Sequence, residues 1–202
     1  MSAVSIPTLG RQDRREQILS AGLDAFVQEG FHQTSMDNIA ERIGVTKPIL
    51  YRYFSSKLEL YLAIVDAQTD KLVNRVTTAL HAPALHQRDR VRAAFSAYFK
   101  YIEAEGASFR LIFESDVSFD EDLRERVERS NRLCAREIAQ TLLSFTALRQ
   151  VEAELLATAL VGMAQTTART RLRDPRGVSS DEAIDLLTQL AWRGLSRFPA
   201  LD

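Results

Sequence analysis

The chain has 202 residues, and its 46% apolar and 26% charged residues are typical of a globular protein and exclude a disordered or fibrous chain. The formal net charge is −1, and the single cysteine, Cys134, excludes an internal disulfide and suggests a reducing, cytoplasmic location. No apolar run reaches about 18 residues, so we expect neither a signal peptide nor a membrane span.

Apolar residues recur at helical spacing along most of the chain, and no strand pattern, internal repeat or low-complexity tract interrupts them. The predicted fold class is therefore all-α. After a mobile arm at 1–10, the predicted helices span 11–29, 34–43, 46–54, 56–80, 88–105, 108–113, 120–143, 150–172 and 181–196.

The two short helices at 34–43 and 46–54 have clear start and stop signals. Thr34 and Thr46 offer hydroxyls that suit N-caps, and Gly44 separates the two helices. Helices this short are not stable alone in water, so they need the preceding helix as a core partner. Two short helices joined by a tight turn predict a helix-turn-helix unit, whose second helix fits the major groove of DNA.

The outer face of the third predicted helix suits contacts with nucleic acid. The first 60 residues carry seven Lys and Arg and seven Asp and Glu, so such contacts depend on the placement of charges and not on their excess. Lysine and arginine can donate to guanine edges or phosphates, isoleucine can touch a thymine methyl group, and hydroxyls can reach phosphates. Residues at helix starts lie beside backbone N–H groups that favour phosphate. The predicted DNA-binding residues are Thr34, Ser35, Thr46, Lys47, Ile49, Tyr51, Arg52, Tyr53 and Lys57.

A helical hairpin with a solvated outer face is the alternative interpretation of such a pattern, and four consecutive motifs argue against it. They are Thr34-Ser-Met-Asp-Asn-Ile-Ala, Gly44-Val-Thr-Lys-Pro, Leu50-Tyr-Arg-Tyr-Phe and Ser56-Lys-Leu-Glu-Leu. Together with the upstream Ala25-Phe and Gly30-Phe, this run resembles the TetR family of bacterial repressors over residues 11–65.

The resemblance implies an all-helical homodimer whose two recognition helices read a palindromic operator. On that pattern a DNA-binding domain spans 11–56, and an effector-binding and dimerisation domain spans 57–202. The resemblance places Lys47, Ile49, Tyr51 and Arg52 near bases, and Thr34, Ser35, Tyr53 and Lys57 near phosphates. Lys47 and Ile49 occupy variable positions of the pattern, so they do not predict the operator sequence.

Aromatic and aliphatic residues on several helices of the second domain form either ordinary core or the lining of an apolar pocket. The candidate pocket residues are Phe95, Phe99, Ile102, Phe109, Leu111, Phe113 and Met163. Few charges interrupt these faces, which favours an apolar effector.

Three segments, Arg110-Leu-Ile-Phe-Glu-Ser-Asp, Leu160-Val-Gly-Met and Gln189-Leu-Ala-Trp-Arg-Gly-Leu, are similar to the actinobacterial regulators of fatty acid synthesis within this family. The similarity implies a long-chain fatty acyl-CoA as effector. Two alternatives stay open, namely a drug-like or aromatic ligand of the kind that efflux or catabolic repressors bind, and an all-helical lipid-binding protein or enzyme.

The last two predicted helices carry small residues on apolar faces, which lets helices approach closely. In the family these helices pair across a two-fold axis, so we expect the subunit interface here, with packing inside one chain as the alternative. The candidate interface residues are Leu155, Ala159, Gly162, Ile184, Leu187, Leu190 and Trp192.

Sequence signals for catalysis or metal binding are absent. His32, His81 and His86 lack ligand spacing, Cys134 lies within a helical apolar face, and no phosphate loop or nucleophile motif occurs. We therefore expect no cofactor, no metal and no enzymatic activity.

Overall fold

The computed structural model describes residues 10–83, 86–107, 109, 121–174 and 177–195, and this described part contains helices and no strand. The helices are α1 (Arg11–Gln33), α2 (Met36–Arg42), α3 (Lys47–Tyr53), α4 (Lys57–Leu80), α5 (Gln87–Ala104), α7 (Glu121–Leu143), α8 (Gln150–Arg173) and α9 (Ser180–Leu195). The predicted all-α class is confirmed. The predicted short helix at 108–113 lies, except for Phe109, outside the described residues.

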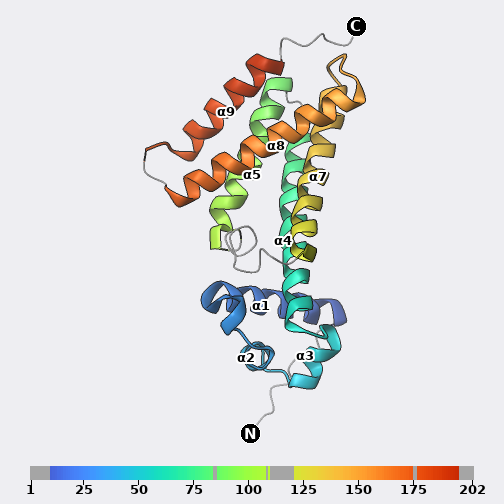
Figure 1. Cartoon of the computed structure of the whole chain (residues 1–202), viewed down its shortest axis with the longest axis vertical. Coiled ribbons are helices and arrows are strands. Elements are labelled where there is room, and N and C mark those ends of the chain that lie inside the picture. Colours follow the sequence, from blue (N-terminus) through green and yellow to red (C-terminus); the bar gives the residue numbers. More distant parts are fainter. Residues whose placement is uncertain (1–9, 84–85, 108, 110–120, 175–176, 196–202) are drawn as a thin grey trace.

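The molecule has a small helical end and a larger helical body joined by one long helix. Figure 1 shows α1, α2 and α3 together at one end, with α1 lying across the base of α4. Helix α4 then runs into the body, where α5 and α7 pack against it and α8 and α9 cover them.

The buried residues form two separate cores that divide within α4. The N-terminal core contains α4 residues up to Val65, and the C-terminal core begins on the same helix at Leu72. One contributor to the N-terminal core comes from far along the chain: Leu123, in the first turn of α7, is buried there with Val127 packed beside it. The larger domain therefore supplies part of the core of the smaller one.

Close approach of α1 and α4 explains the glycine at position 22. A Cβ atom on Gly22 would lie 2.9 Å from Ile64 Cδ1 and 3.3 Å from a methyl carbon of Leu60. Because glycine has no side chain, α4 can pack directly against α1 at this point. This close contact fixes the start of α4 on the N-terminal helices.

Helix ends follow local signals with one correction. Gly30 has φ 78°, as expected for a glycine stop, although a last turn continues to Gln33. The N-cap of α2 is Ser35, whose hydroxyl accepts from the Asn38 N–H at 3.1 Å. The prediction that Thr34 caps α2 is therefore wrong, because Thr34 is buried and belongs to the end of α1.

Candidate functional site

The outer face of α3 is exposed as its helical periodicity predicts. Leu50 is fully buried and Phe54 nearly so, which turns the opposite face of the helix to solvent. Ile49 and Tyr51 are large apolar or aromatic side chains that remain 36% and 41% exposed. The exposed residues of this face are Thr46, Lys47, Ile49, Tyr51 and Arg52. Thr46 stands at the N-cap position of α3, as predicted, but its hydroxyl makes no capping hydrogen bond.

Lys47 is held by an acidic neighbour that sequence reasoning did not assign to the site. Its ammonium group lies 2.9 Å from Asp37 Oδ1 on α2 and 6.0 Å from the centre of the Tyr51 ring. The hydrogen bond and the charge of Asp37 raise the pKa of Lys47 above its usual value. The pair is exposed on both sides, so it orients the lysine and contributes little to stability.

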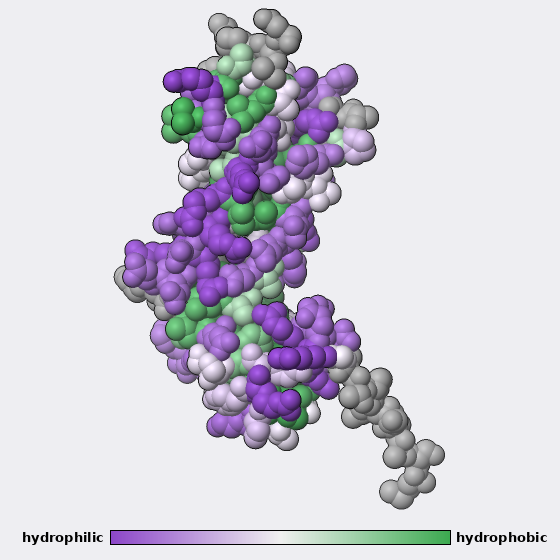
Figure 2. Space-filling view, turned by 90° about the vertical axis from the view of Figure 1, so that its right-hand side faces the viewer, coloured by the Kyte–Doolittle hydropathy of each residue, from purple (hydrophilic) through white to green (hydrophobic). Residues whose placement is uncertain are grey.

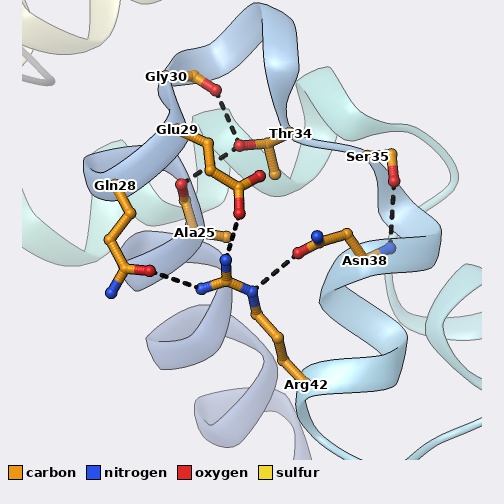
Figure 3. Close-up of polar contacts among 8 residues, drawn as sticks. All are labelled: Ala25, Gln28, Glu29, Gly30, Thr34, Ser35, Asn38 and Arg42. Atoms are coloured by element: carbon orange, nitrogen blue, oxygen red, sulfur yellow. Dashed lines mark hydrogen bonds and ion pairs between the residues drawn. The ribbon is translucent and has the colours of Figure 1, made fainter.

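Thr34 and Ser35 are neighbours with different roles (Figure 3). The Thr34 hydroxyl is buried and donates to the carbonyl oxygens of Gly30, at 2.8 Å, and Ala25, at 3.3 Å. It ties the end of α1 to the body of that helix and does not face solvent. The expectation that this hydroxyl holds a phosphate is therefore corrected, whereas exposed Ser35 stays in the candidate set.

The side chains of Lys57 and Tyr53 also contact the protein itself and do not point into solvent. The Lys57 ammonium donates to the carbonyl oxygens of Phe31 at 2.8 Å and Thr34 at 3.0 Å, and lies 4.5 Å from the Phe31 ring centre. It caps the last turn of α1, where unpaired carbonyls favour a cation. Tyr53 is half-buried against the N-terminal core. Neither lies on the exposed face of α3.

Arg42 joins the first two helices and was missed in the sequence. Figure 3 shows its guanidinium between Asn38 on α2 and two residues of α1. It donates to Asn38 Oδ1 at 2.8 Å and Gln28 Oε1 at 3.0 Å, and it also pairs with Glu29. Three acceptors on two helices fix the angle at which α2 leaves α1, and so the position of α3.

A partly open apolar cavity of about 40 Å³ lies in the C-terminal region between α4, α5, α7 and α8. Its wall is built mainly of aliphatic and aromatic side chains, including Val76, Val91, Phe95 and Ile138. The cavity is far smaller than the roughly 300–1,000 Å³ of typical ligand pockets. A larger ligand therefore has to separate the surrounding helices.

Few polar groups line this cavity. Gln87 and Arg90 lie at the N-terminal end of α5, while Tyr98 and Cys134 lie deeper along α5 and α7. Burial raises the pKa of the Tyr98 hydroxyl far above its usual value, with a smaller contribution from the Cys134 thiol, so the phenol stays neutral. Burial also raises the pKa of Cys134 to about 12, which keeps the thiol protonated and unreactive.

The candidate pocket residues separate in the structure. Phe95 lines the cavity, but Phe99, Ile102 and Phe109 are packed in the C-terminal core and Met163 lies half-buried against it. Leu111 and Phe113 lie outside the described residues. On α5 the cavity is lined by Val91, Phe95 and Tyr98, of which only Phe95 was a predicted pocket residue, because helical periodicity does not show where an apolar face leaves a void.

Helices α8 and α9 each carry a pair of exposed apolar side chains, which are Val151 and Leu155 on α8 and Leu186 and Leu190 on α9. These four side chains are between 60% and 72% exposed, at i, i+4 spacing on each helix. Ala159 is exposed and Gly162 and Trp192 half-buried. The interface expectation needs correction for Ile184 and Leu187, which are buried in the chain's own core. Figure 2, which views the α7 side, shows a largely hydrophilic surface with smaller apolar groups.

Two helices connect the cavity with the N-terminal core. Helix α4 starts beside α3 and reaches the cavity at Val76 and Leu80. Helix α7 lines the cavity with its second half and inserts Leu123 into the N-terminal core with its first turn. An ion pair between Arg126 of α7 and Asp66 of α4 joins the two helices near that core.

Features of other protein classes are absent from the described part. None of its helices is both long and apolar enough to cross a bilayer. Its His, Cys, Asp and Glu residues nowhere form a group of three that could hold a metal ion.

The exposed second helix of a helix-turn-helix unit, mounted on a helical body with an apolar cavity, defines the class of helix-turn-helix transcriptional regulators. Residues 18–64 match the family model of bacterial regulatory proteins of the tetR family, and residues 87–194 match the tetracyclin repressor-like C-terminal domain. The chain belongs to the TetR family and is a DNA-binding transcriptional regulator of that type. Its family and relatives are regulators and not enzymes.

Individual relatives agree with this assignment. The chain is 38% identical over 191 residues, covering 95% of it and 87% of the relative, to the HTH-type transcriptional activator FasR of Mycolicibacterium smegmatis. This similarity supports the subgroup expected from the sequence. A TetR-like regulator from Rhodococcus sp. RHA1 has a TM-score of 0.70 at 32% identity, covering 94% of this chain and 99% of that one.

A third solved structure is similar in fold alone. It is the transcriptional regulator FadR of Bacillus subtilis in complex with stearoyl-CoA. Its TM-score is 0.68 at 15% identity, and the match covers 87% of this chain and 96% of that chain.

Proposed function

We propose that this regulator binds a palindromic operator as a homodimer and that a long-chain fatty acyl-CoA changes its operator affinity, so that it controls lipid synthesis in the cytoplasm. The observation that carries the proposal is the apolar cavity at the meeting point of the two helices that reach the DNA-binding end. The similarity to FasR supports the lipid class of the effector.

On the DNA side, the exposed face of α3 supplies the base contacts. Lys47, Ile49, Tyr51 and Arg52 project from it, with Thr46 at its start and Ser35 at the start of α2. Arg52 is exposed on this face, so its guanidinium can reach a guanine or a phosphate. When the protein binds DNA, the Lys47 ammonium group leaves Asp37 and contacts the DNA instead.

On the effector side, the cavity wall suits an alkyl chain. Its side chains are nearly all apolar, and burying methylene groups against them contributes about 0.8 kcal/mol per group. Arg90 is the cation of the lining, and its guanidinium already donates to the Leu80 carbonyl oxygen, which holds it at the N-terminal end of α5. An acidic head group fits beside it.

The coupling between the cavity and the DNA-contacting face of α3 follows from the small volume of the cavity. A chain longer than the cavity separates α4, α5, α7 and α8, and α4 and α7 both end in the N-terminal core. Their movement changes the separation of the two recognition helices of a dimer. Because half-sites on DNA have a fixed spacing, that change alters operator affinity.

The subunit interface is proposed on α8 and α9. Val151 and Leu155 on α8 and Leu186 and Leu190 on α9 are large apolar side chains left exposed, and exposed apolar groups often mark contacts between proteins. A two-fold axis through this surface brings the same residues of each subunit together. We expect Leu155→Glu combined with Leu190→Glu to give monomers in analytical ultracentrifugation.

A drug-like ligand is the alternative within this class. The same apolar wall accepts an aromatic compound, so the ligand has to be identified directly. An all-helical lipid-binding protein without DNA affinity is the alternative from another class, and salt-dependent DNA binding separates it from a regulator.

The first experiment combines ligand identification with selection of DNA. Native mass spectrometry of the purified protein, followed by denaturing extraction, is expected to show a dimer carrying an acyl chain or acyl-CoA. Selection from random duplex DNA is expected to return a palindrome. A dimer that stays empty after incubation with acyl-CoAs would contradict the effector class while leaving DNA binding intact.

The DNA-contacting face is tested with single variants. We expect Lys47→Ala to change the selected sequence and Tyr51→Phe to weaken binding to all sequences alike. Lys100→Ala, on the exposed side of α5 far from α3, is the matched control and keeps wild-type affinity. Operator binding that is unchanged in both α3 variants would show that the assigned surface is wrong.

A further inference from the structure

The exposed end of the helix-turn-helix unit carries a carboxylate beside its recognition helix. Asp37 lies in the first turn of α2, and its Oδ1 atom is 2.9 Å from the ammonium nitrogen of Lys47, the first residue of α3. The side chains of Asp37 and Lys47 are 63% and 57% exposed, so neither is held by burial. Because the two groups are in contact, a base edge that Lys47 reaches also comes close to Asp37.

This carboxylate does not help general attraction to DNA. Phosphates attract lysine and arginine and repel a carboxylate, so Asp37 weakens non-specific electrostatic binding. Glu29, another carboxylate of this end, pairs with Arg42 on the neighbouring helix. Within the described part of the chain, both carboxylate oxygens of Asp37 bind Lys47, Oδ1 at 2.9 Å and Oδ2 at 3.0 Å. Once Lys47 contacts DNA, Asp37 needs a new hydrogen-bond donor.

The base edges in the major groove differ in what they offer a carboxylate, which only accepts hydrogen bonds when ionised. Guanine presents the acceptors N7 and O6, and thymine presents O4 and a methyl group, so neither base can donate to Asp37. Adenine presents its N6 amino group beside the acceptor N7, whereas cytosine presents only its N4 amino group. Cytosine therefore suits Asp37 best, and the guanine paired with it offers two acceptors to Lys47.

We propose that Asp37 is a specificity-determining residue, which accepts a hydrogen bond from the N4 amino group of a cytosine in each half-site while Lys47 donates to the guanine of the same base pair. Cytosine N4 and guanine O6 are hydrogen-bonded to each other at about 2.9 Å, so a carboxylate and an ammonium group that start in contact can each turn to one of them. This inference rests on the proposed function, because it takes the exposed face of α3 as the DNA-contacting face.

The test is selection of duplex DNA from a random pool by the full-length protein and by Asp37→Asn. Wild type is expected to select a C·G pair in each half-site, and its replacement by T·A in one half-site is expected to weaken binding about five- to a hundredfold. Asp37→Asn is expected to lose most of this penalty and to accept adenine, because an asparagine amide can bind N6 and N7 of adenine. Its affinity for random DNA is expected to rise about two- to tenfold.

Asp70→Asn is the matched control for the loss of one carboxylate. Asp70 is exposed on α4, 13 residues after Lys57 at the start of that helix, which is about 20 Å along the helix axis. Salt screens most of the effect of a charge at that distance, so this variant is expected to select the wild-type sequence with affinity changed by less than about twofold.

Lys47→Ala separates failure of this inference from failure of the proposed DNA-contacting face. If Lys47→Ala changes the selected sequence but Asp37→Asn keeps the wild-type selection and the T·A penalty, Asp37 does not read a base and the inference is overturned. Wild-type half-sites without a C·G pair, or an Asp37→Asn variant that binds all sequences more tightly to the same degree, would also overturn it. If neither variant changes the selection, the proposed face is wrong and the inference fails with it.

Discussion

The two cores of this regulator both contain buried aromatic rings but differ in their number of buried alanines. In the N-terminal core, Phe26, Phe31 and Tyr61 form a cluster of rings whose centres lie 5.0 to 5.8 Å apart. The buried residues of the C-terminal core include eight alanines, which are Ala135, Ala139, Ala153, Ala157, Ala164, Ala168, Ala183 and Ala191. The same core also contains the cavity.

This difference matches the two tasks. Reading an operator requires a recognition helix at a fixed angle, and interlocked rings resist rearrangement. Accepting a ligand requires helices that can separate, and alanine contacts hold neighbouring helices with less apolar surface than large side chains do. The C-terminal core also holds buried rings, among them Phe99, Tyr101 and Phe109, so its many alanines and its cavity are what leave its helices room to separate.

Phe26→Ala is expected to have the largest effect, because it removes the centre of the ring cluster. Phe26 is 1% exposed, and loss of a buried phenylalanine destabilises by about 3–5 kcal/mol. Urea unfolding measures the change, and operator binding is expected to be lost with it. The neighbouring Val27→Ala, at a residue 37% exposed, is the control and changes stability by under about 0.5 kcal/mol.

Enlarging one alanine in each core sharpens the comparison. Ala40 is packed in the N-terminal core and does not line the cavity. Ala40→Leu is therefore expected to destabilise the protein by about 1–3 kcal/mol through overpacking. Ala164→Leu extends into the cavity and is expected to change stability by less than about 1 kcal/mol. Effector affinity is expected to fall only in Ala164→Leu. Equal destabilisation by the two variants would contradict the contrast between the cores.

Thr34→Val tests the corrected role of that threonine. It removes the hydrogen bonds to the Gly30 and Ala25 carbonyls and is expected to destabilise by about 1 kcal/mol. Well below its melting temperature, the variant is expected to bind operator normally with an unchanged salt dependence. Thr34→Ser keeps the hydroxyl and serves as control. Reduced operator affinity in fully folded Thr34→Val would restore Thr34 as a phosphate contact.

The link between α7 and α4 is expected to have the smallest effect on stability. Asp66 and Arg126 are each about a third exposed, so their coupling in a double-mutant cycle with Asp66→Asn and Arg126→Gln is expected to be about 0.2–1 kcal/mol. Added salt is expected to reduce it. A coupling above about 2 kcal/mol would mean that this pair, and not apolar packing, holds the two helices together.

Most helix ends could be predicted from the sequence because they depend on local signals. The predicted and observed bounds of α4, α7, α8 and α9 agree within one residue at each end. The exposed face of α3 was also predictable, since Leu50 and Phe54 define its buried side. Thr34 and Ser35 both offer a hydroxyl that could cap α2. Only the structure shows that Ser35 is the cap, because Thr34 is buried at the end of α1.

Contacts between distant segments could not be predicted in this way. The inward turn of Ile184 and Leu187 depends on how α9 sits on α5, and helical periodicity identifies an apolar face without naming its partner. The cavity exists because the side chains of four helices do not fill the space between them, and a sequence pattern of apolar residues cannot show such incomplete packing. The ion pair between Asp37 and Lys47 joins α2 and α3 across the turn. The separation of these two residues in the sequence does not indicate that they are in contact.

The position of Leu123 limits how this protein can be engineered. Because α7 inserts this residue into the N-terminal core, residues 11–65 are not a self-contained module. A biosensor made by grafting that segment onto a different sensor domain would carry an unfilled hole in its N-terminal core. Chimeras therefore need either the first turn of α7 or a host helix that presents a leucine at the same place.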